Sequence, residues 1–293
     1  MASVITLLSP HPALMVDVGE RVLVVADLHL GLEVDLAKQG INIPFQWGVI
    51  LERLLGLVRE HTPERLLILG DVKHGVPATS FQEKQAIPTF FKALLEEVPR
   101  IDVCRGNHDS NIEALLPPQV TLHSSKGVLL GEDLQVAAMH GHAWPDPQSL
   151  TAETLLIGHN HPTVSLSTPL GVRFQRPVWL RGSLNPAGIV KAVLEWEGVK
   201  VEDSDPLELF RSEYGVDPRL REIIVVPMFN ELLGGLPVNL EPPESLLGPL
   251  FREHIVDLGG FEAFLLDGTY LGCIDFLREH HSIEVVSRQQ TKV

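Results

Sequence analysis

Five short motifs stand out in the sequence because each holds side chains that bind metal ions or move protons. Their members are aspartate, asparagine and histidine. The motifs are Asp27-Leu28-His29, Gly70-Asp71, Gly106-Asn107-His108-Asp109, His140-Gly141-His142 and Gly158-His159-Asn160-His161. A ligand set of imidazole nitrogen with carboxylate and amide oxygen, without thiolate, is better suited to bind a reactive Mn, Fe, Ni or Zn ion than to bind a structural zinc ion. The residue types therefore predict a metal centre.

Each motif directly follows a short apolar run that is typical of a buried strand. The five runs cover residues 21–26, 66–69, 101–104, 134–139 and 154–157. Open α/β sheets place their chemistry at the carboxyl ends of the strands, so the five motifs should gather at one edge. Residues i and i+2 share a side of a strand, so Asp27 and His29 can converge on one ion. The fivefold repetition is the strong signal.

Seven side chains in these motifs are candidate metal ligands. They are Asp27, His29, Asp71, Asn107, His140, His159 and His161. Seven ligands are too many for one such ion, and they suit two ions that share a carboxylate, about 3.5 to 4 Å apart as in other two-metal sites. Asp71 has two oxygens and could form that bridge. His142 lies on the same side of its strand as His140, so it could replace His140 or bind substrate.

A pair of divalent ions predicts phosphoester chemistry. Such ions supply hydroxide at neutral pH and neutralise phosphate oxygens while the hydroxide attacks phosphorus in line. The leaving oxygen then needs a proton, and His108 is the imidazole of its motif that need not be a ligand. Asp109 could orient His108 or raise its pKa. Arg105 and Arg181 could hold phosphate, although arginine is usually solvated.

In this order and at strand ends, the motifs D-x-H, G-D, G-N-H-D, H-G-H and G-H-x-H resemble those of the calcineurin-like metallophosphoesterases, over residues 27–161. The resemblance implies an α/β fold, a four-layer α/β/β/α sandwich of two mixed sheets flanked by helices. It implies two divalent ions, with manganese expected first. It assigns one ion to Asp27, His29, Asp71 and His161, and the other to Asp71, Asn107, His140 and His159. His108 would contact the scissile phosphate and serve the leaving group.

Residues 70–74, 226–230 and 267–272 resemble a prokaryotic subgroup related to the Mre11/SbcD nucleases and often encoded beside DNA-repair helicases. That resemblance implies single-stranded or duplex DNA as substrate and a functional link to a helicase. Lys73 and His74 depart from the family pattern, which often has an acidic or amide residue there. Because they stand where substrate could pass, they are candidate substrate contacts, and the choice between monoester and diester stays open.

The net charge of -15 limits the choice of partners, because 38 acidic residues outnumber 23 basic ones. Such a chain should repel polyanions unless bound cations override the mean charge locally. A nuclease-like phosphodiesterase is the leading hypothesis. A phosphatase or phosphodiesterase for nucleotides or other small phosphates fits the acidic charge better. A non-catalytic scaffold on the same fold is the third hypothesis, and the complete ligand set argues against it.

The remaining composition is that of an ordinary globular enzyme. No apolar run approaches the roughly 20 residues of a membrane span, and residues 1–16 lack the basic start of a signal peptide. Two cysteines provide no disulfide framework, so a cytoplasmic protein is expected. We expect one domain over residues 1–293, with a motif-bearing core of 1–203 and an extension of 204–293 packed on it. Apolar strands near the termini could build a homodimer.

The pattern also predicts individual elements outside the motifs. A helix is expected at 47–61, and capping boxes predict helices after Ser80 and after Ser110. Residues 31–44 are expected to be a connection. After Pro162 we expect antiparallel strands at 163–167, 172–175, 178–180, 189–196 and 199–202, with a hairpin turn at 196–199, then a strand at 223–226 and helices at 244–255 and 274–281. Six histidines have no partner pattern and are expected to be ordinary surface or interface residues: His11, His61, His123, His254, His280 and His281.

Overall fold

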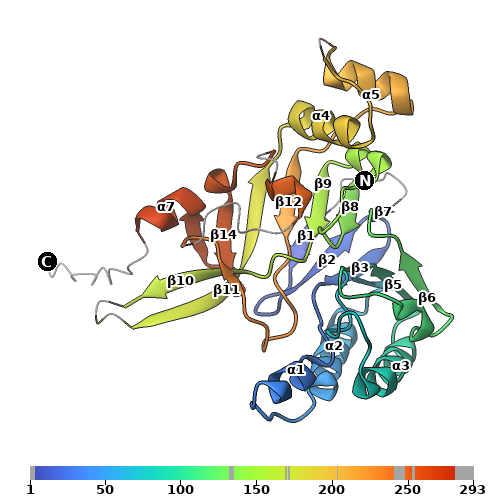
Figure 1. Ribbon diagram of the computed structural model, residues 1–293, viewed down its shortest axis with the longest axis vertical. Coiled ribbons are helices and arrows are strands. Elements are labelled where there is room, and N and C mark those ends of the chain that lie inside the picture. Colours follow the sequence, from blue (N-terminus) through green and yellow to red (C-terminus); the bar gives the residue numbers. More distant parts are fainter. Residues whose placement is uncertain are drawn as a thin grey trace, which may run out of the picture.

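Two β-sheets packed face to face form the centre of the molecule (Figure 1). The computed structural model describes residues 4–131, 135–168, 170, 172–202, 204–240, 248–252 and 255–280. The first sheet has the order β1-β2-β3-β4-β5-β6. Its strands are β1 Val4–Leu7, β2 Ala13–Asp17, β3 Arg21–Val25, β4 Arg65–Ile68, β5 Arg100–Cys104 and β6 Val120–His123. Strands β3 to β6 are parallel, which brings the carboxyl ends of β3, β4 and β5 to one edge.

The second sheet has the order β13-β10-β11-β12-β9-β8-β7, with β14 paired to β11 and β15 to β14. Its strands are β7 Val128–Leu130, β8 Val136–Met139, β9 Thr154–Ile157, β10 Pro162–Ser167, β11 Arg173–Ser183, β12 Glu222–Val225, β13 Leu236–Pro237, β14 Glu262–Leu265 and β15 Tyr270–Cys273. Strands β8, β9 and β12 are mutually parallel, so β8 and β9 end side by side. The other pairs are antiparallel except β10 with β13.

Helices cover the outer faces of both sheets. The α-helices are α1 Leu32–Lys38, α2 Trp47–His61, α3 Phe81–Leu95, α4 Pro186–Trp196, α5 Pro206–Tyr214, α6 Pro249–Arg252 and α7 Ile274–Glu279. Leu54 of α2 and Phe90 of α3 share one core with the first sheet. Ile189 and Val193 of α4 belong to the core on the outer face of the second sheet. These layers confirm the expected four-layer α/β/β/α sandwich.

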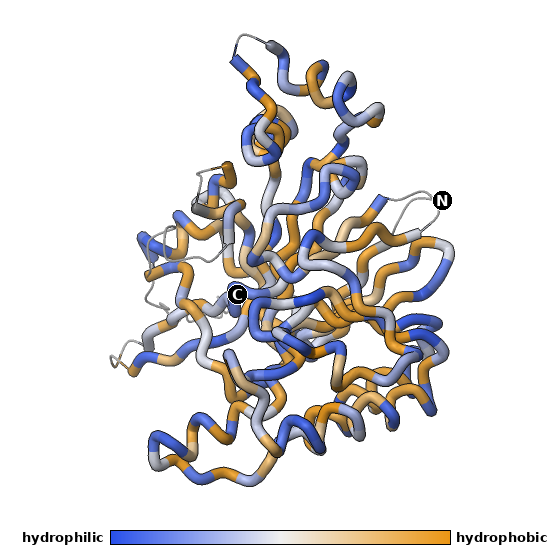
Figure 2. The backbone as a smooth tube through the Cα atoms, turned by 45° about the vertical axis from the view of Figure 1, so that its right-hand side comes forward, coloured by the Kyte–Doolittle hydropathy of each residue, from blue (hydrophilic) through white to orange (hydrophobic). Residues whose placement is uncertain are grey.

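A third core fills the space between the sheets. Leu67 of β4, Ala138 of β8 and Trp179 of β11 are buried in it. Figure 2 shows the hydrophobic stretches along the central strands, whereas hydrophobic and hydrophilic residues alternate along the helices. The buried strands thus hold the motif-bearing loops against each other. Within the described residues, none of the helices is long and apolar enough to cross a lipid bilayer.

Several elements match the sequence-based predictions. Helix α2 has the expected bounds, and Ser80 forms a capping box with Glu83 at the start of α3. Strands β10 and β12 and helix α7 lie where expected. Of the helix expected at 244–255, the described part is helical at α6, and residues 244–247 and 253–254 lie outside the described residues.

Several predictions of local structure were wrong. Residues 199–202 form no strand, and the two strands expected at 172–175 and 178–180 are one strand, β11. The segment 31–44 contains α1, and η1 Ile112–Ala114, a 3-10 helix, replaces the helix expected after Ser110. Residues 189–196 belong to α4 rather than to a strand, so no hairpin turn follows at 196–199. The Asn185 side chain accepts hydrogen bonds from two N–H groups of its first turn, which starts the helix. The β-branched residues Ile189, Val190 and Val193 suggested a strand, but their spacing buries one helical face.

Candidate metal centre

The five motifs meet where β3, β4 and β5 of one sheet and β8 and β9 of the other end. Five of the seven expected ligands adopt a left-handed backbone there. They are Asp27 (φ 56°), His29 (φ 41°), Asp71 (φ 49°), His159 (φ 71°) and His161 (φ 43°). Such a conformation costs a non-glycine residue about 1 to 3 kcal/mol and tends to cluster at functional sites. The strand ends therefore turn sharply to aim these side chains into one space.

One group of ligand atoms comes from Asp27, His29 and His161, which lie within 4.8 Å of one another. His161 Nε2 is 3.3 Å from Asp27 Oδ1, and His29 Nε2 is 3.3 Å from Asp71 Oδ2. The second carboxylate oxygen of Asp27 accepts the backbone N–H of His159 at 3.0 Å, which fixes the carboxylate. These are three of the four side chains that the family resemblance assigns to the first ion.

A second group comes from Asp71, His140 and His159. His140 Nε2 lies 3.3 Å from Asp71 Oδ2 and 3.0 Å from Asn107 Oδ1. His140 Nδ1 donates to the carbonyl of Leu69 at 2.7 Å, so Nε2 is the nitrogen left for an ion. Because Asp71 Oδ2 is 3.3 Å from both His29 Nε2 and His140 Nε2, Asp71 stands between the two groups.

Three buried polar atoms support a cation in the first group. Asp27 Oδ1, His29 Nε2 and His161 Nε2 are buried and make no hydrogen bond in the described structure. Buried polar groups are normally hydrogen-bonded, so three such atoms without a hydrogen bond call for a ligand. All three atoms face the space that the first ion would fill. The donor set therefore fits two divalent ions.

The charges of the site balance one another in the metal-free protein. Burial alone would lower the pKa of His140, but the carboxylates of Asp71 and Asp27 outweigh it and raise the pKa to about 9. Burial would raise the pKa of Asp71, yet His140 and His29 hold it well below its usual range. Burial, and then the charge of His140, lowers the pKa of His159 to about 3. A protonated His140 imidazole thus offsets part of the negative charge of Asp71 and Asp27, whose carboxylate oxygens lie 3.3 and 3.7 Å from its nitrogens.

His108 is placed for proton transfer. Its backbone N–H donates to Asp71 Oδ1 at 2.8 Å, and its Nδ1 lies 2.7 Å from the carbonyl of His74. A carbonyl only accepts, so Nδ1 carries a proton and Nε2 is left to exchange one with a ligand. The ring of His108 lies with its centroid 4.7 Å from that of His29.

Asp109 differs from the expectation that it orients the His108 ring. Its buried carboxylate accepts the backbone N–H groups of Val72 at 2.9 Å, Lys73 at 3.3 Å and Gly106 at 2.9 Å. These bonds tie the loop after β4 to the loop after β5. Burial, and then the charge of Asp71, raises the pKa of Asp109 to about 6. The structure gives Asp109 a positioning role.

A chain of contacts runs outward from His29. Its Nδ1 lies 3.1 Å from His74 Nδ1, and His74 Nε2 lies 3.3 Å from a carboxylate oxygen of Asp35 in α1. If His29 Nε2 faces an ion, its Nδ1 carries the proton and donates to His74, whose Nε2–H then points to Asp35. His74 therefore borders the site, while Asp35 was missed because residues 31–44 were expected to be a mere connection.

The remaining candidate substrate contacts are not among the residues that line the space between the two ligand groups. Lys73 is fully buried, and its ammonium group donates to the Gly75 carbonyl, so the structure does not support a substrate contact. Arg105 pairs with Glu113 at 3.0 Å, and Arg181 with Glu222 at 2.6 Å. His142 lies 5.2 Å from His140 between ring centroids, and the second ligand group contains His140 rather than His142.

One histidine outside the motifs was misjudged. His123 was expected to be an ordinary surface or interface residue. Its Nε2 instead lies 2.6 Å from Asp102 Oδ1, and Asp102 is completely buried in β5. Arg65 donates to the other oxygen of Asp102 at 2.6 Å. Arg65 and Asp102 thus form a buried ion pair within the first sheet, and the half-buried His123 is hydrogen-bonded to Asp102.

Comparison with known proteins agrees with this geometry. Residues 20–217, which include all five motifs, match the Calcineurin-like phosphoesterase (Metallophos) family. The chain belongs to the calcineurin-like phosphoesterase family. This membership confirms the family resemblance, whereas the Mre11/SbcD-related subgroup stays a prediction.

Two individual proteins are similar to this calcineurin-like chain. Phosphodiesterase YfcE of Escherichia coli K12 is 31% identical over 114 residues, which are 38% of this chain and 61% of YfcE. The chain therefore spans less than two thirds of that relative. The crystal structure of Pseudomonas putida nuclease MPE superimposes with a TM-score of 0.51 and 20% identity, covering 92% of this chain and 99% of the nuclease. That likeness concerns the fold.

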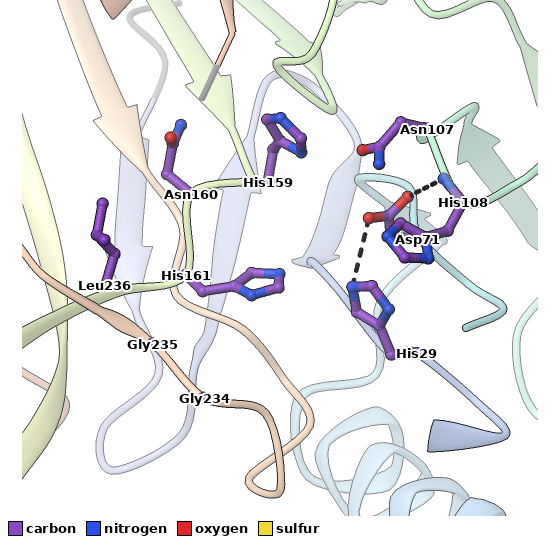
Figure 3. Close-up of a pocket in the computed structure, with 10 residues that line it drawn as sticks. All are labelled: His29, Asp71, Asn107, His108, His159, Asn160, His161, Gly234, Gly235 and Leu236. Atoms are coloured by element: carbon purple, nitrogen blue, oxygen red, sulfur yellow. Dashed lines mark hydrogen bonds and ion pairs between the residues drawn. The ribbon is translucent and has the colours of Figure 1, made fainter. Parts of the chain in front are cut away.

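The calcineurin-like centre opens into a pocket of about 290 Å³ (Figure 3). In Figure 3 the imidazoles of His29 and His161 approach from opposite sides, and dashed lines join Asp71 to His29 and to the backbone of His108. One wall is formed by Gly234, Gly235 and Leu236 of the C-terminal extension. A Cβ atom on Gly235 would overlap Thr163 and come within 2.7 Å of the His161 carbonyl, so glycine permits this close approach.

The chain after β12 contacts the loop that holds Asp27 and His29. Asn230 Nδ2 donates to the Leu28 carbonyl at 2.9 Å, and the Phe229 N–H donates to the Ala26 carbonyl at 2.8 Å. The Arg53 guanidinium lies 4.1 Å from the centre of the Phe229 ring. Sequence reasoning singled out residues 226–230 only as a subgroup resemblance. Nothing local in the sequence shows that they contact a loop about 200 positions away.

Proposed function

We propose that this chain is a two-metal phosphodiesterase that acts on nucleic acid. One observation carries the proposal: two groups of ligand atoms, Asp27 with His29 and His161, and Asp71 with His140 and His159, lie on either side of one shared carboxylate. Asn107 completes the second group, and His108 stands beside the pair. Manganese is the metal we expect first, with iron, nickel or zinc as alternatives.

The residues divide the work of the reaction. When bound, two divalent ions would neutralise the phosphate oxygens and lower the pKa of water, so that hydroxide is available as nucleophile near neutral pH. Asp71 Oδ2 lies between the two ligand groups, and the backbone N–H of His108 holds the other carboxylate oxygen, Asp71 Oδ1, in place. His108, oriented by the His74 carbonyl, gives a proton from Nε2 to the leaving oxygen. The half-enclosed pocket positions the ester between these groups.

The choice of a nucleic acid diester rests on three considerations. The relative with 31% identity is named a phosphodiesterase, and the chain shares its fold with a protein named a nuclease. The resemblance of residues 226–230 and 267–272 to a DNA-repair-associated subgroup points the same way. The net charge of -15 favours a second candidate, a phosphatase or phosphodiesterase for nucleotides or other small phosphates.

Substrate comparison tests the proposal. The full-length protein, loaded with Mn, Fe, Ni or Zn in turn, is assayed with bis(p-nitrophenyl) phosphate, with p-nitrophenyl phosphate, and with labelled single-stranded and duplex DNA. We expect the diester to be hydrolysed faster than the monoester, and DNA to be cut. Absence of cleavage of either DNA form with every ion would refute nucleic acid as substrate. Faster hydrolysis of the monoester would favour the phosphatase.

A leaving-group comparison tests the role of His108. The variant His108→Asn should lose about 100-fold or more in kcat on DNA, whose leaving alkoxide needs a proton. It should lose much less on bis(p-nitrophenyl) phosphate, whose phenolate leaves without one. His61→Asn, at the end of α2, is the matched control. Equal losses on both substrates would show that His108 does not serve the leaving group.

A further inference from the structure

A second hollow, of about 730 Å³, adjoins the metal pocket. Asn107 and His159 line both spaces, so the two hollows lie next to each other. From there the hollow passes His142 and reaches Lys126 and a pair of tryptophans, Trp144 and Trp196. We call this hollow the tryptophan groove. A chain-like substrate whose phosphate lies at the metals would extend into it.

The two tryptophans form a stacked pair at the end of the groove. Their ring centroids are 6.0 Å apart and the planes meet at 30°. Trp144, which follows His140-Gly141-His142 closely, is 9% exposed, whereas Trp196 at the end of α4 is 63% exposed. Packing against Trp144 therefore holds the Trp196 ring, while much of that ring stays accessible. A fixed and exposed indole is suited to stacking with another flat ring.

The charges of the groove oppose a purely electrostatic site. Lys126 Nζ lies 2.9 Å from a carboxylate oxygen of Glu197 and is also influenced by the negative charge of Asp146. The single lysine is thus neutralised by its neighbours. Phosphate would gain little here, and the overall charge of -15 would oppose it. An uncharged aromatic group suits the tryptophan groove better than an anion does.

We propose that Trp196 stacks a nucleobase of the nucleotide whose phosphate lies at the metal centre. This inference rests on the proposed function and names a base-binding subsite for it. Base stacking tolerates any sequence because every base has a π face. It also lets an acidic protein hold nucleic acid, with the ions binding phosphate and the indole binding the base. His108, which serves the leaving oxygen, lines the metal pocket and is not among the residues that line the tryptophan groove. The stacked base therefore belongs to the nucleoside that stays on the phosphate.

Kinetics with Trp196 variants test the subsite. Trp196→Ala should raise KM for single-stranded DNA roughly 10- to 100-fold, and Trp196→Phe, which keeps a π face, should restore most of the loss. An abasic nucleotide beside the scissile phosphate should raise the KM of the unaltered protein by a similar factor. Combining Trp196→Ala with the abasic substrate should then add little. Phe276→Ala, an exposed aromatic on α7, is the control and should leave KM unchanged.

A binding measurement gives a readout that does not depend on turnover. In EDTA, thymidine oligonucleotides should quench the tryptophan fluorescence of the unaltered protein, and Trp196→Ala should remove most of that quenching. A thymidine dinucleotide in parallel distinguishes a small nucleotide from a strand, since both carry the same base. If Trp196→Ala reduces the quenching by dinucleotide and by oligonucleotide equally, the contact with Trp196 involves a single base.

The two proposals can fail separately. If the unaltered protein hydrolyses no phosphodiester with any ion, the proposed function fails, and the quenching titration still decides the subsite. If DNA is cleaved but Trp196→Ala keeps the KM of the unaltered protein, the subsite is refuted. An equal increase in KM caused by Trp196→Ala on abasic and on base-bearing DNA would also refute it.

Discussion

Asn230 offers a test of how the chain after β12 supports the candidate metal centre. Its side chain is 2% exposed, its Nδ2 donates to the Leu28 carbonyl at 2.9 Å, and its Oδ1 accepts the Leu232 N–H at 3.0 Å. Leu28 is completely buried between the ligands Asp27 and His29. In Asn230→Ala the Leu28 carbonyl would be left unsatisfied in the interior, which costs about 1 to 3 kcal/mol.

The same change should weaken metal binding. Asp27 and His29 have φ angles of 56° and 41°, and each such conformation costs about 1 to 3 kcal/mol that the surroundings must oppose. Without the Asn230 amide, the loop can relax toward ordinary backbone angles and move both ligands. Loss of an outer hydrogen bond of this kind typically lowers metal affinity about 10- to 100-fold. We expect that loss for manganese in Asn230→Ala.

A second buried asparagine provides the control. Asn239 is 3% exposed and bonds both the N–H and the carbonyl of Ser165 in β10, at 2.8 and 2.9 Å. Asn239→Ala should lose similar stability in urea unfolding of the metal-free protein, but keep its manganese affinity in titration calorimetry. If Asn230→Ala binds manganese as tightly as Asn239→Ala does, the proposed support of the Asp27–His29 loop is wrong.

Two further predictions concern the bridge and the protons. In Gly106→Ala, the new Cβ would overlap the backbone nitrogen and the carboxylate of Asp71, so we expect metal analysis to show that both ions are lost. Gly188→Ala in α4 is the control and should retain both ions, because the atom nearest to its new Cβ is 3.7 Å away. The pKa of His140 is raised to about 9 in the metal-free protein, so its contribution to the free energy of unfolding should be present below about pH 6.5 and vanish as pH rises through about 9. Over the same interval manganese affinity should rise, with proton release that calorimetry in two buffers detects; an affinity independent of pH would contradict the raised pKa.

The gathering of the seven candidate ligands was predictable from sequence because each of them lies in a loop that follows a buried strand. Asp71 and Asn107 needed only the rule that parallel strands end at the same edge, and the structure brings both to that edge. Helix α2 was predictable for a similar reason, since Leu51, Leu54 and Val58 recur at helical spacing and are buried. These features depend on short stretches of chain.

The features that sequence reasoning missed depend on contacts between distant residues. Asn230 donates to a carbonyl 202 positions away, and Gly235 lies close against Thr163 and the His161 carbonyl. Asp109 is held by backbone N–H groups of another loop, which its position beside His108 concealed. Helix α4 was mistaken for a strand because β-branched side chains can face a core from either structure.

The central claim is that two ions lie on either side of Asp71. Crystals of the full chain soaked in manganese, measured at a wavelength where manganese scatters anomalously, test it most directly. We predict two anomalous peaks about 3.5 to 4 Å apart, one beside Asp27, His29 and His161 and the other beside Asn107, His140 and His159. A single peak, or no peak next to Asp71, would contradict the two-metal centre.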